Sequence, residues 1–117
     1  MINGVHGLIY TPAANEVRSF FRDVLGFSWV DAGDGWLIFA LPPTELGIHP
    51  AEANRHELYL MCDDIDATRA ELSAKGAEFA GPVSDRGFGR VAQIALPGGG
   101  GRLALYEPRH PTAIDLP

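Results

Sequence analysis

Residues 56–62 (HELYLMC) decide the fold when they are compared with residues 6–10 (HGLIY). Each stretch opens with a histidine, continues as an apolar run of strand length, and precedes a segment with helical periodicity. Three pairs of identical residues match at one offset of fifty, without a gap: His6 and His56, Leu8 and Leu58, and Gly26 and Gly76. A repeated element order at a fixed offset indicates an internal duplication.

The first half predicts the order strand, helix, strand, strand, strand. Residues 6–10 alternate like a strand, and Thr11-Pro12 is typical of a helix start. One helical face follows, formed by Val17, Phe20, Phe21, Val24 and Leu25 and ended by Gly26. Residues 27–32 and 36–41 predict two strands joined by a turn at 33–35, and residues 45–49 a third.

The second half repeats this order. Residues 56–62 predict a strand, Asp63 and Asp64 (with Asp66) are typical of a helix N-terminus, and residues 65–75 predict the helix. Strands are expected at 77–83, 90–96 and 102–107, with a loop at 84–89 and a glycine-rich turn at 97–101. The predicted fold is therefore α+β, a single domain over 1–117. It has two tandem βαβββ modules, at about 4–50 and 55–108, that form a cupped mixed sheet, and an irregular tail at 109–117.

Charge and composition exclude several classes of partner. The chain has 117 residues, a formal net charge of −6 and no cluster of basic residues that could follow a phosphate backbone. We therefore expect no nucleic-acid partner. The sequence shows no signal peptide and no apolar run long enough to span a bilayer, so we expect no membrane association and a cytoplasmic location. The single cysteine, Cys62, lies in an apolar strand and reads as a small buried side chain.

The duplicated βαβββ order, with His6 and His56 opening the two modules, resembles the vicinal oxygen chelate superfamily. The superfamily includes glyoxalase I, extradiol dioxygenases and bleomycin-binding resistance proteins. The resemblance covers residues 4 to about 108. It rests on the element order, on FFRDVLGF (20–27), on HELYLMCDDIDA (56–67) and on the glycine-rich turn before the last strand.

The resemblance implies a site for a divalent transition metal (Zn, Ni, Fe or Mn) in the cup. His6 and His56 match the family's two histidine positions, but Ala104 stands where the family carries its carboxylate ligand. Glu107 lies three residues further on, and an odd step reverses the face of a strand. Internal symmetry pairs Glu107 with His49. Either these two complete a quartet with the histidines, or His49 alone supplies the third ligand. His110 follows the last predicted strand and is expected to have no role.

Two functions remain open on this evidence. The first is a metal-dependent protein, similar to a glyoxalase or a dioxygenase, that acts on a small oxygen-bearing organic substrate. The second is a metal-free protein of the bleomycin-resistance type that binds or sequesters a small organic molecule, with the loss of the metal leaving His6 and His56 as structural residues. In both cases we expect a homodimer. Six aromatic residues are candidates for the lining of the cup: Trp29, Trp36, Phe39, Tyr59, Phe88 and Tyr106.

Overall fold

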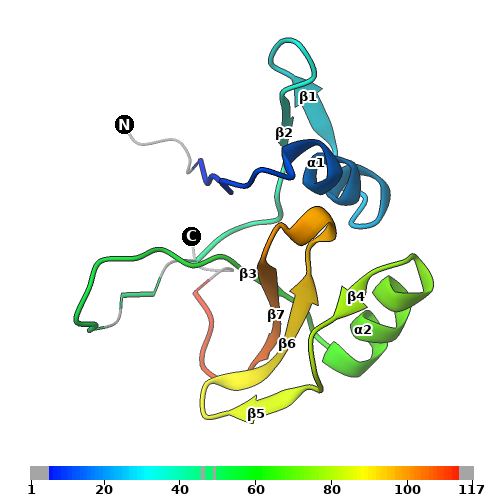
Figure 1. Ribbon diagram of the computed structural model, residues 1–117. Helices are drawn as coiled ribbons and strands as arrows, with labels where there is room; N and C mark the ends of the chain where they lie inside the picture. Colours follow the sequence, from blue (N-terminus) through cyan, green and yellow to red (C-terminus); the bar gives the residue numbers. More distant parts are fainter. Residues whose placement is uncertain (1–5, 46, 49, 114–117) are drawn as a thin grey trace.

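The computed structural model describes residues 6–45, 47–48 and 50–113, and Figure 1 shows its arrangement. A helix and a short hairpin form one end of the molecule, and a sheet with a second helix beside it forms the other. The elements are α1 (Ala14–Asp23), β1 (Trp29–Asp31), β2 (Leu37–Phe39), β3 (Tyr59–Met61), α2 (Ile65–Ala74), β4 (Glu78–Phe79), β5 (Ser84–Arg86), β6 (Gly89–Ala95), the 3-10 turn η1 (Pro97–Gly99) and β7 (Arg102–Pro108). This mixture of helices and sheets confirms the α+β class.

Helix α1 forms because its apolar side chains recur on one face. Val17, Phe20 and Phe21 are buried there, as the periodicity predicts. The helix begins three residues after Thr11, whose hydroxyl instead accepts a hydrogen bond from the backbone N–H of Ala13 at 3.1 Å. Gly26 follows the helix in the left-handed conformation (φ 72°), which costs glycine little.

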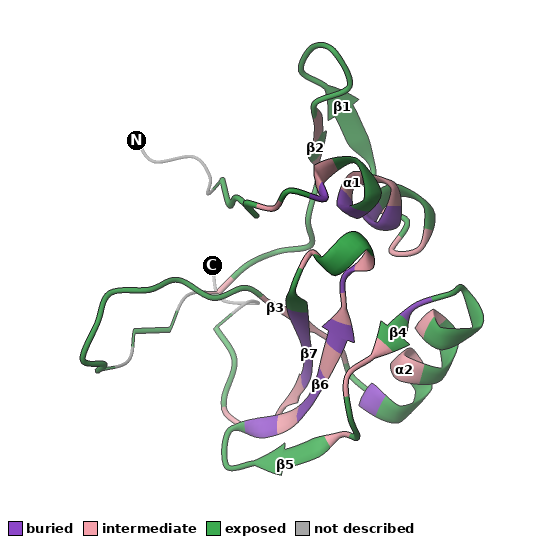
Figure 2. Cartoon of the chain, in the orientation of Figure 1, coloured by how far each residue is buried: buried purple, intermediate pink, exposed green. Residues whose placement is uncertain are grey.

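Strand β7 lies at the centre of a five-stranded sheet with the order β3-β7-β6-β4, and β5 also pairs with β6. β3 and β7 run parallel, so that Tyr59 lies opposite Ala104 and Met61 opposite Tyr106. β6 and β7 run antiparallel and place Arg90 beside Glu107. The buried residues follow these two central strands and the inner face of α1 (Figure 2).

The alternation of β6 and β7 separates two apolar clusters. The larger one packs against both helices and contains Ala92, Ile94, Leu103 and Leu105 of the sheet. The smaller one lies on the opposite face of the sheet, which we call the helix-free face, and its buried members are Val91, Ala104 and Tyr106. Tyr59 and Met61 of β3 pack against it. One face of the sheet is thus taken by helices, and the other presents a compact apolar and aromatic surface.

The glycine-rich turn lets α1 approach the sheet. A Cβ atom added to Gly98 would come within 2.8 Å of the Ala13 Cβ, and one added to Gly100 within 2.8 Å of Cγ2 of Val17. Gly98 also has a positive φ of 65°. Gly98 and Gly100 therefore serve packing between the two ends of the molecule as well as the turn itself.

Several expected strands differ from the structure. Residues 6–10 form no strand, and neither do residues 45, 47 and 48; positions 46 and 49 lie outside the described residues. A strand needs a hydrogen-bonded neighbour, and within the described chain these first-half segments have none. The tandem arrangement of modules and their boundaries therefore stay a prediction.

In the second half, the expected strand 77–83 shortens to Glu78–Phe79, and part of the expected loop 84–89 becomes β5. Ser84, Asp85 and Arg86 are all polar, so the sequence shows no alternation of apolar and polar residues that would predict a strand. All three side chains are exposed. This segment is a strand only because its backbone pairs with that of β6. Within the described residues, no helix is long and apolar enough to cross a membrane.

Candidate functional site

Three of the six predicted aromatic residues meet on the helix-free face. The ring centroids of Tyr59 and Tyr106 lie 5.3 Å apart, those of Tyr59 and Phe88 6.3 Å, and those of Phe88 and Tyr106 6.0 Å. All three pairs are edge-to-face, which is the favourable arrangement for aromatic quadrupoles. Tyr106 is only 8% exposed, whereas Phe88 remains 41% exposed. We call these three residues the aromatic cluster.

The backbone of β6 and β7 fixes the aromatic cluster. Tyr106 and Val91 are register partners, and Gly89, at the start of β6, lies directly against the neighbouring strand. A Cβ atom on Gly89 would meet the carbonyl oxygen of Glu107 at 2.5 Å and Cδ2 of Tyr106 at 3.2 Å. Glycine at this position therefore allows the close approach that holds the Tyr106 ring in place.

His110 joins the aromatic cluster, although the sequence predicts no role for it. Its ring stacks on Tyr106 with centroids 6.0 Å apart. Nδ1 lies 2.8 Å from the carbonyl oxygen of Pro111, which can only accept, so the neutral ring carries its proton on Nδ1 and donates there. Nε2 is then free to accept from the Tyr106 hydroxyl at 3.2 Å. His110 lies just beyond the end of β7, in a segment without regular structure, so its spacing from Tyr106 could not have revealed this contact.

Burial shapes the protonation of this region. It raises the pKa of the Tyr59 hydroxyl, and the nearby Glu57 carboxylate raises it further. Burial likewise raises the pKa of Tyr106, to which the negative charge of Glu45 adds. The pKa of the half-buried Cys62 thiol is also raised, chiefly by burial, and its Sγ donates to the Tyr106 carbonyl oxygen at 3.6 Å. These groups stay protonated and neutral at physiological pH.

The predicted metal ligands do not come together in the described residues. His6 and His56 both lie in exposed segments without regular structure, and His49 lies outside the described residues. Ala104 faces the aromatic cluster and offers no donor atom. Across residues 6–45, 47–48 and 50–113, no group of three His, Cys, Asp or Glu side chains could hold a metal ion. The donor set described here therefore does not fit a metal centre.

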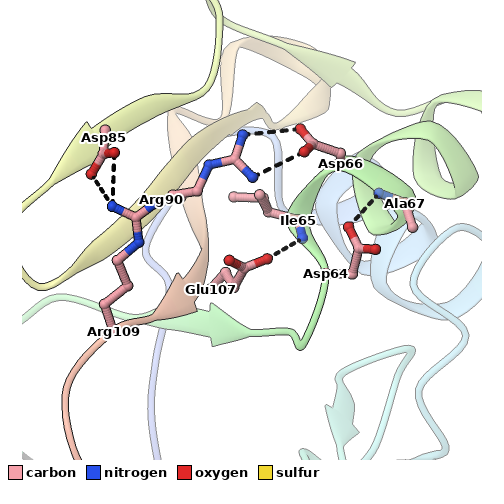
Figure 3. A network of polar contacts seen from close by, with 8 residues as sticks. All are labelled: Asp64, Ile65, Asp66, Ala67, Asp85, Arg90, Glu107 and Arg109. Carbon is pink, nitrogen blue, oxygen red and sulfur yellow. Dashed lines mark hydrogen bonds and ion pairs between the residues drawn. The ribbon is translucent and has the colours of Figure 1, made fainter.

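Glu107 is engaged elsewhere, as Figure 3 shows. Glu107 lies three residues after Ala104 on β7, so the two side chains point to opposite faces of the sheet. Its Oε1 accepts a hydrogen bond from the backbone N–H of Ile65, the first residue of α2, at 3.0 Å. Beside it, Arg90 binds the Asp66 carboxylate with two bonds of 2.9 and 3.2 Å. Asp64 caps the same helix through the N–H of Ala67 at 3.1 Å, as its position in the sequence predicts. Glu107 thus anchors a helix.

The other predicted aromatic residues lie away from the aromatic cluster. Phe39 packs in the core with its ring centroid 5.5 Å from that of Phe21. Trp29 and Trp36 belong to the exposed hairpin at the other end of the molecule (Figure 1). Trp29 lines a shallow hollow between α1 and the hairpin with Arg18 and Asp31. The sequence identified aromatic residues as candidates for a binding site, but it could not show which of them lie on the helix-free face of the sheet.

Comparison with solved structures identifies proteins of the same fold. TnmS3, an antibiotic-binding protein from Streptomyces sp. CB03234, is 24% identical in sequence; the match covers 92% of this chain and 97% of that one, with a TM-score of 0.64. A member of the glyoxalase/bleomycin resistance protein/dioxygenase superfamily from Sphaerobacter thermophilus DSM 20745 is 21% identical (coverage 91% of this chain and 98% of that one, TM-score 0.63). A lactoylglutathione lyase from Agrobacterium tumefaciens is 14% identical (coverage 90% and 92%, TM-score 0.63). At these identities the likeness concerns the fold. No curated protein sequence matches the chain.

A family model settles the membership that the fold suggests. It describes the Glyoxalase/Bleomycin resistance protein/Dioxygenase superfamily and matches residues 5–110, nearly the whole chain. The resemblance seen in the sequence is thereby confirmed. The protein belongs to the glyoxalase/bleomycin resistance protein/dioxygenase superfamily.

Proposed function

We propose that this protein binds a small, planar organic molecule on the helix-free face, without a metal. The aromatic cluster carries the proposal, because a small apolar residue, Ala104, lies beside it where a metal-binding relative needs a carboxylate. Binding sites for organic molecules are mostly apolar, with a few polar groups that set orientation. The Tyr59 and Tyr106 hydroxyls and the His110 ring supply such groups here.

A second copy of the chain is the proposed wall of the site. Several large apolar side chains of the first half that lie outside the hairpin are exposed, among them Leu8, Tyr10, Leu41 and Ile48, and Tyr10 is 87% exposed. Exposed apolar side chains that form one continuous patch mark an interface in soluble proteins. A homodimer would cover these residues and deepen the open aromatic surface into a pocket.

The proposal is tested by titrating naphthylmethanol, a neutral planar probe, into the protein in a calorimeter. Phe88→Ala removes the exposed ring of the aromatic cluster and leaves the partly buried Tyr59 and the buried Tyr106 in place. We expect its affinity for the probe to fall about three- to tenfold, the range expected when one aromatic contact is lost. The matched control is Trp36→Ala, which removes a ring that is 66% exposed on the hairpin.

The control is expected to bind the probe like the unaltered protein. Equal losses in Phe88→Ala and Trp36→Ala would mean that the probe adheres to any exposed ring, and the proposed site would be rejected. Absence of measurable binding to the unaltered protein would reject it as well.

A metal-dependent activity on an oxygen-bearing substrate is the second candidate. Its support is the family together with the equivalence of His6 and His56 at the two module starts. Its ligands would be His6, His56 and His49, or Glu107, but the bond from Ile65 to Glu107 weighs against the last. Elemental analysis of protein purified without chelator tests it. About one transition metal per chain, lost in His56→Ala, would favour this candidate over metal-free binding.

A further inference from the structure

Glu45 has a buried carboxylate oxygen without a hydrogen-bond partner. Its Oε2 accepts from the backbone N–H of Ala113 at 2.8 Å. Its Oε1 is shielded from solvent, and no donor among the described residues reaches it. A carboxylate oxygen deprived of water and of a partner is costly, so buried polar groups normally have a hydrogen-bond partner. This is the one buried side-chain oxygen or nitrogen in the described chain with that deficit.

The tail after β7 connects Glu45 to the aromatic cluster. The Arg109 backbone N–H donates to the Phe88 carbonyl oxygen at 2.8 Å, His110 stacks on Tyr106, and Ala113 reaches Glu45. Only two residues separate His110 from Ala113, so the carboxylate lies near the edge of the aromatic cluster. The negative charge of Glu45 also adds to the raised pKa of Tyr106, after burial.

We infer that the ligand carries a protonated amine beside its planar body, and that Oε1 of Glu45 receives this ammonium group. The inference rests on the proposed function and names its ligand class. An ammonium N–H makes a charge-assisted bond to a carboxylate, and aromatic ring faces attract cations as well. The arginine of the tail, Arg109, is held by Asp85 through bonds of 2.6 and 2.7 Å and leaves the position to a ligand.

Three probes of one shape but different charge test the inference: naphthylmethylammonium, naphthylmethanol and naphthoate. We expect the unaltered protein to bind the ammonium probe at least about tenfold more tightly than the alcohol, and the carboxylate more weakly still. Glu45→Gln keeps an oxygen for the Ala113 N–H but replaces the receiving oxygen with an NH₂ group. It is expected to bring the ammonium and alcohol probes within about twofold of each other.

The control is Glu52→Gln, which removes the same charge from an exposed position of the same loop and should keep the preference. Equal affinities of the unaltered protein for the ammonium and alcohol probes would overturn the inference and leave the proposed function standing. If no probe binds, the proposed function fails with it. If Glu45→Gln retains the preference but loses the dimer in analytical ultracentrifugation, a second copy supplies the donor, and the inference is wrong. The comparison within the unaltered protein holds even if a variant does not fold.

Discussion

Glu107 gives the sharpest test of the structure, because it separates an anchor of α2 from a metal ligand. Its carboxylate accepts the N–H of Ile65, one of the first N–H groups of a helix that have no partner within the helix. Ile65 is fully buried, so water is a poor substitute for the carboxylate. We therefore expect Glu107→Ala to destabilise the metal-free protein, and Glu107→Gln to do so less.

The magnitude follows from the bond that is lost. A hydrogen bond to a charged acceptor contributes about 2 kcal/mol net, and the helix dipole favours the negative charge at this end. Glu107→Ala should lower the free energy of unfolding by about 2 kcal/mol, or Tm by about 8 °C for a domain of this size. Glu107→Gln keeps a neutral acceptor and should cost about 1 kcal/mol.

Urea unfolding of the metal-free protein, followed by circular dichroism, measures both changes. The control is Glu78→Ala, which removes an exposed carboxylate from β4 and should change stability by less than about 0.5 kcal/mol. If Glu107→Ala were no worse than Glu78→Ala, the anchor described here would be wrong. If it instead abolished uptake of a metal at unchanged stability, Glu107 would belong to a metal site.

Two further predictions concern packing and protonation. Gly89→Ala should destabilise the protein by about 2 kcal/mol or more, since its Cβ meets the Glu107 carbonyl oxygen at 2.5 Å, while Gly87→Ala has open space and should be mild; urea midpoints compare them. Burial raises the pKa of Tyr59 and Tyr106 above the ordinary 10.0. The contribution of the two protonated hydroxyls to stability is therefore complete below pH 10.0 and is lost as the pH rises through their folded pKa. Urea midpoints at about pH 7 and about pH 10.5 should show this decline, and equal midpoints would contradict it.

The sequence predicted both helices well because local signals determine them. The buried face of α1 and the Asp64 cap of α2 are each encoded within a few residues. The hairpin around residues 33–35 was equally local, since Asp34 and its flanking glycines supply the positive φ values that its turn requires. Positions 6–10 read as a strand by the same local logic, but a strand depends on a partner elsewhere in the chain or in another one.

The candidate site was harder to predict because it depends on distant contacts. Tyr59, Phe88 and Tyr106 were three of the six aromatic candidates, and nothing local separates them from Trp36 or Phe39. His110 lies in a segment without regular structure, where no periodicity reveals that it stacks on Tyr106. No sequence pattern marks Glu45, and only the fold shows that the N–H of Ala113 reaches its carboxylate.

The central place of β7 has a consequence for the order in which the chain folds. β6 and β7 are neighbours in sequence and can close as a hairpin across the glycine-rich turn, a local step with a small entropic cost. That hairpin already sets Arg90 beside Glu107, so both polar anchors of α2 exist before the helix docks. β3 must then pair in parallel with the free edge of β7, and α2 docks with it because α2 directly follows β3 in sequence. We therefore expect the closing of the sheet and the anchoring of α2 to occur as one late, cooperative event.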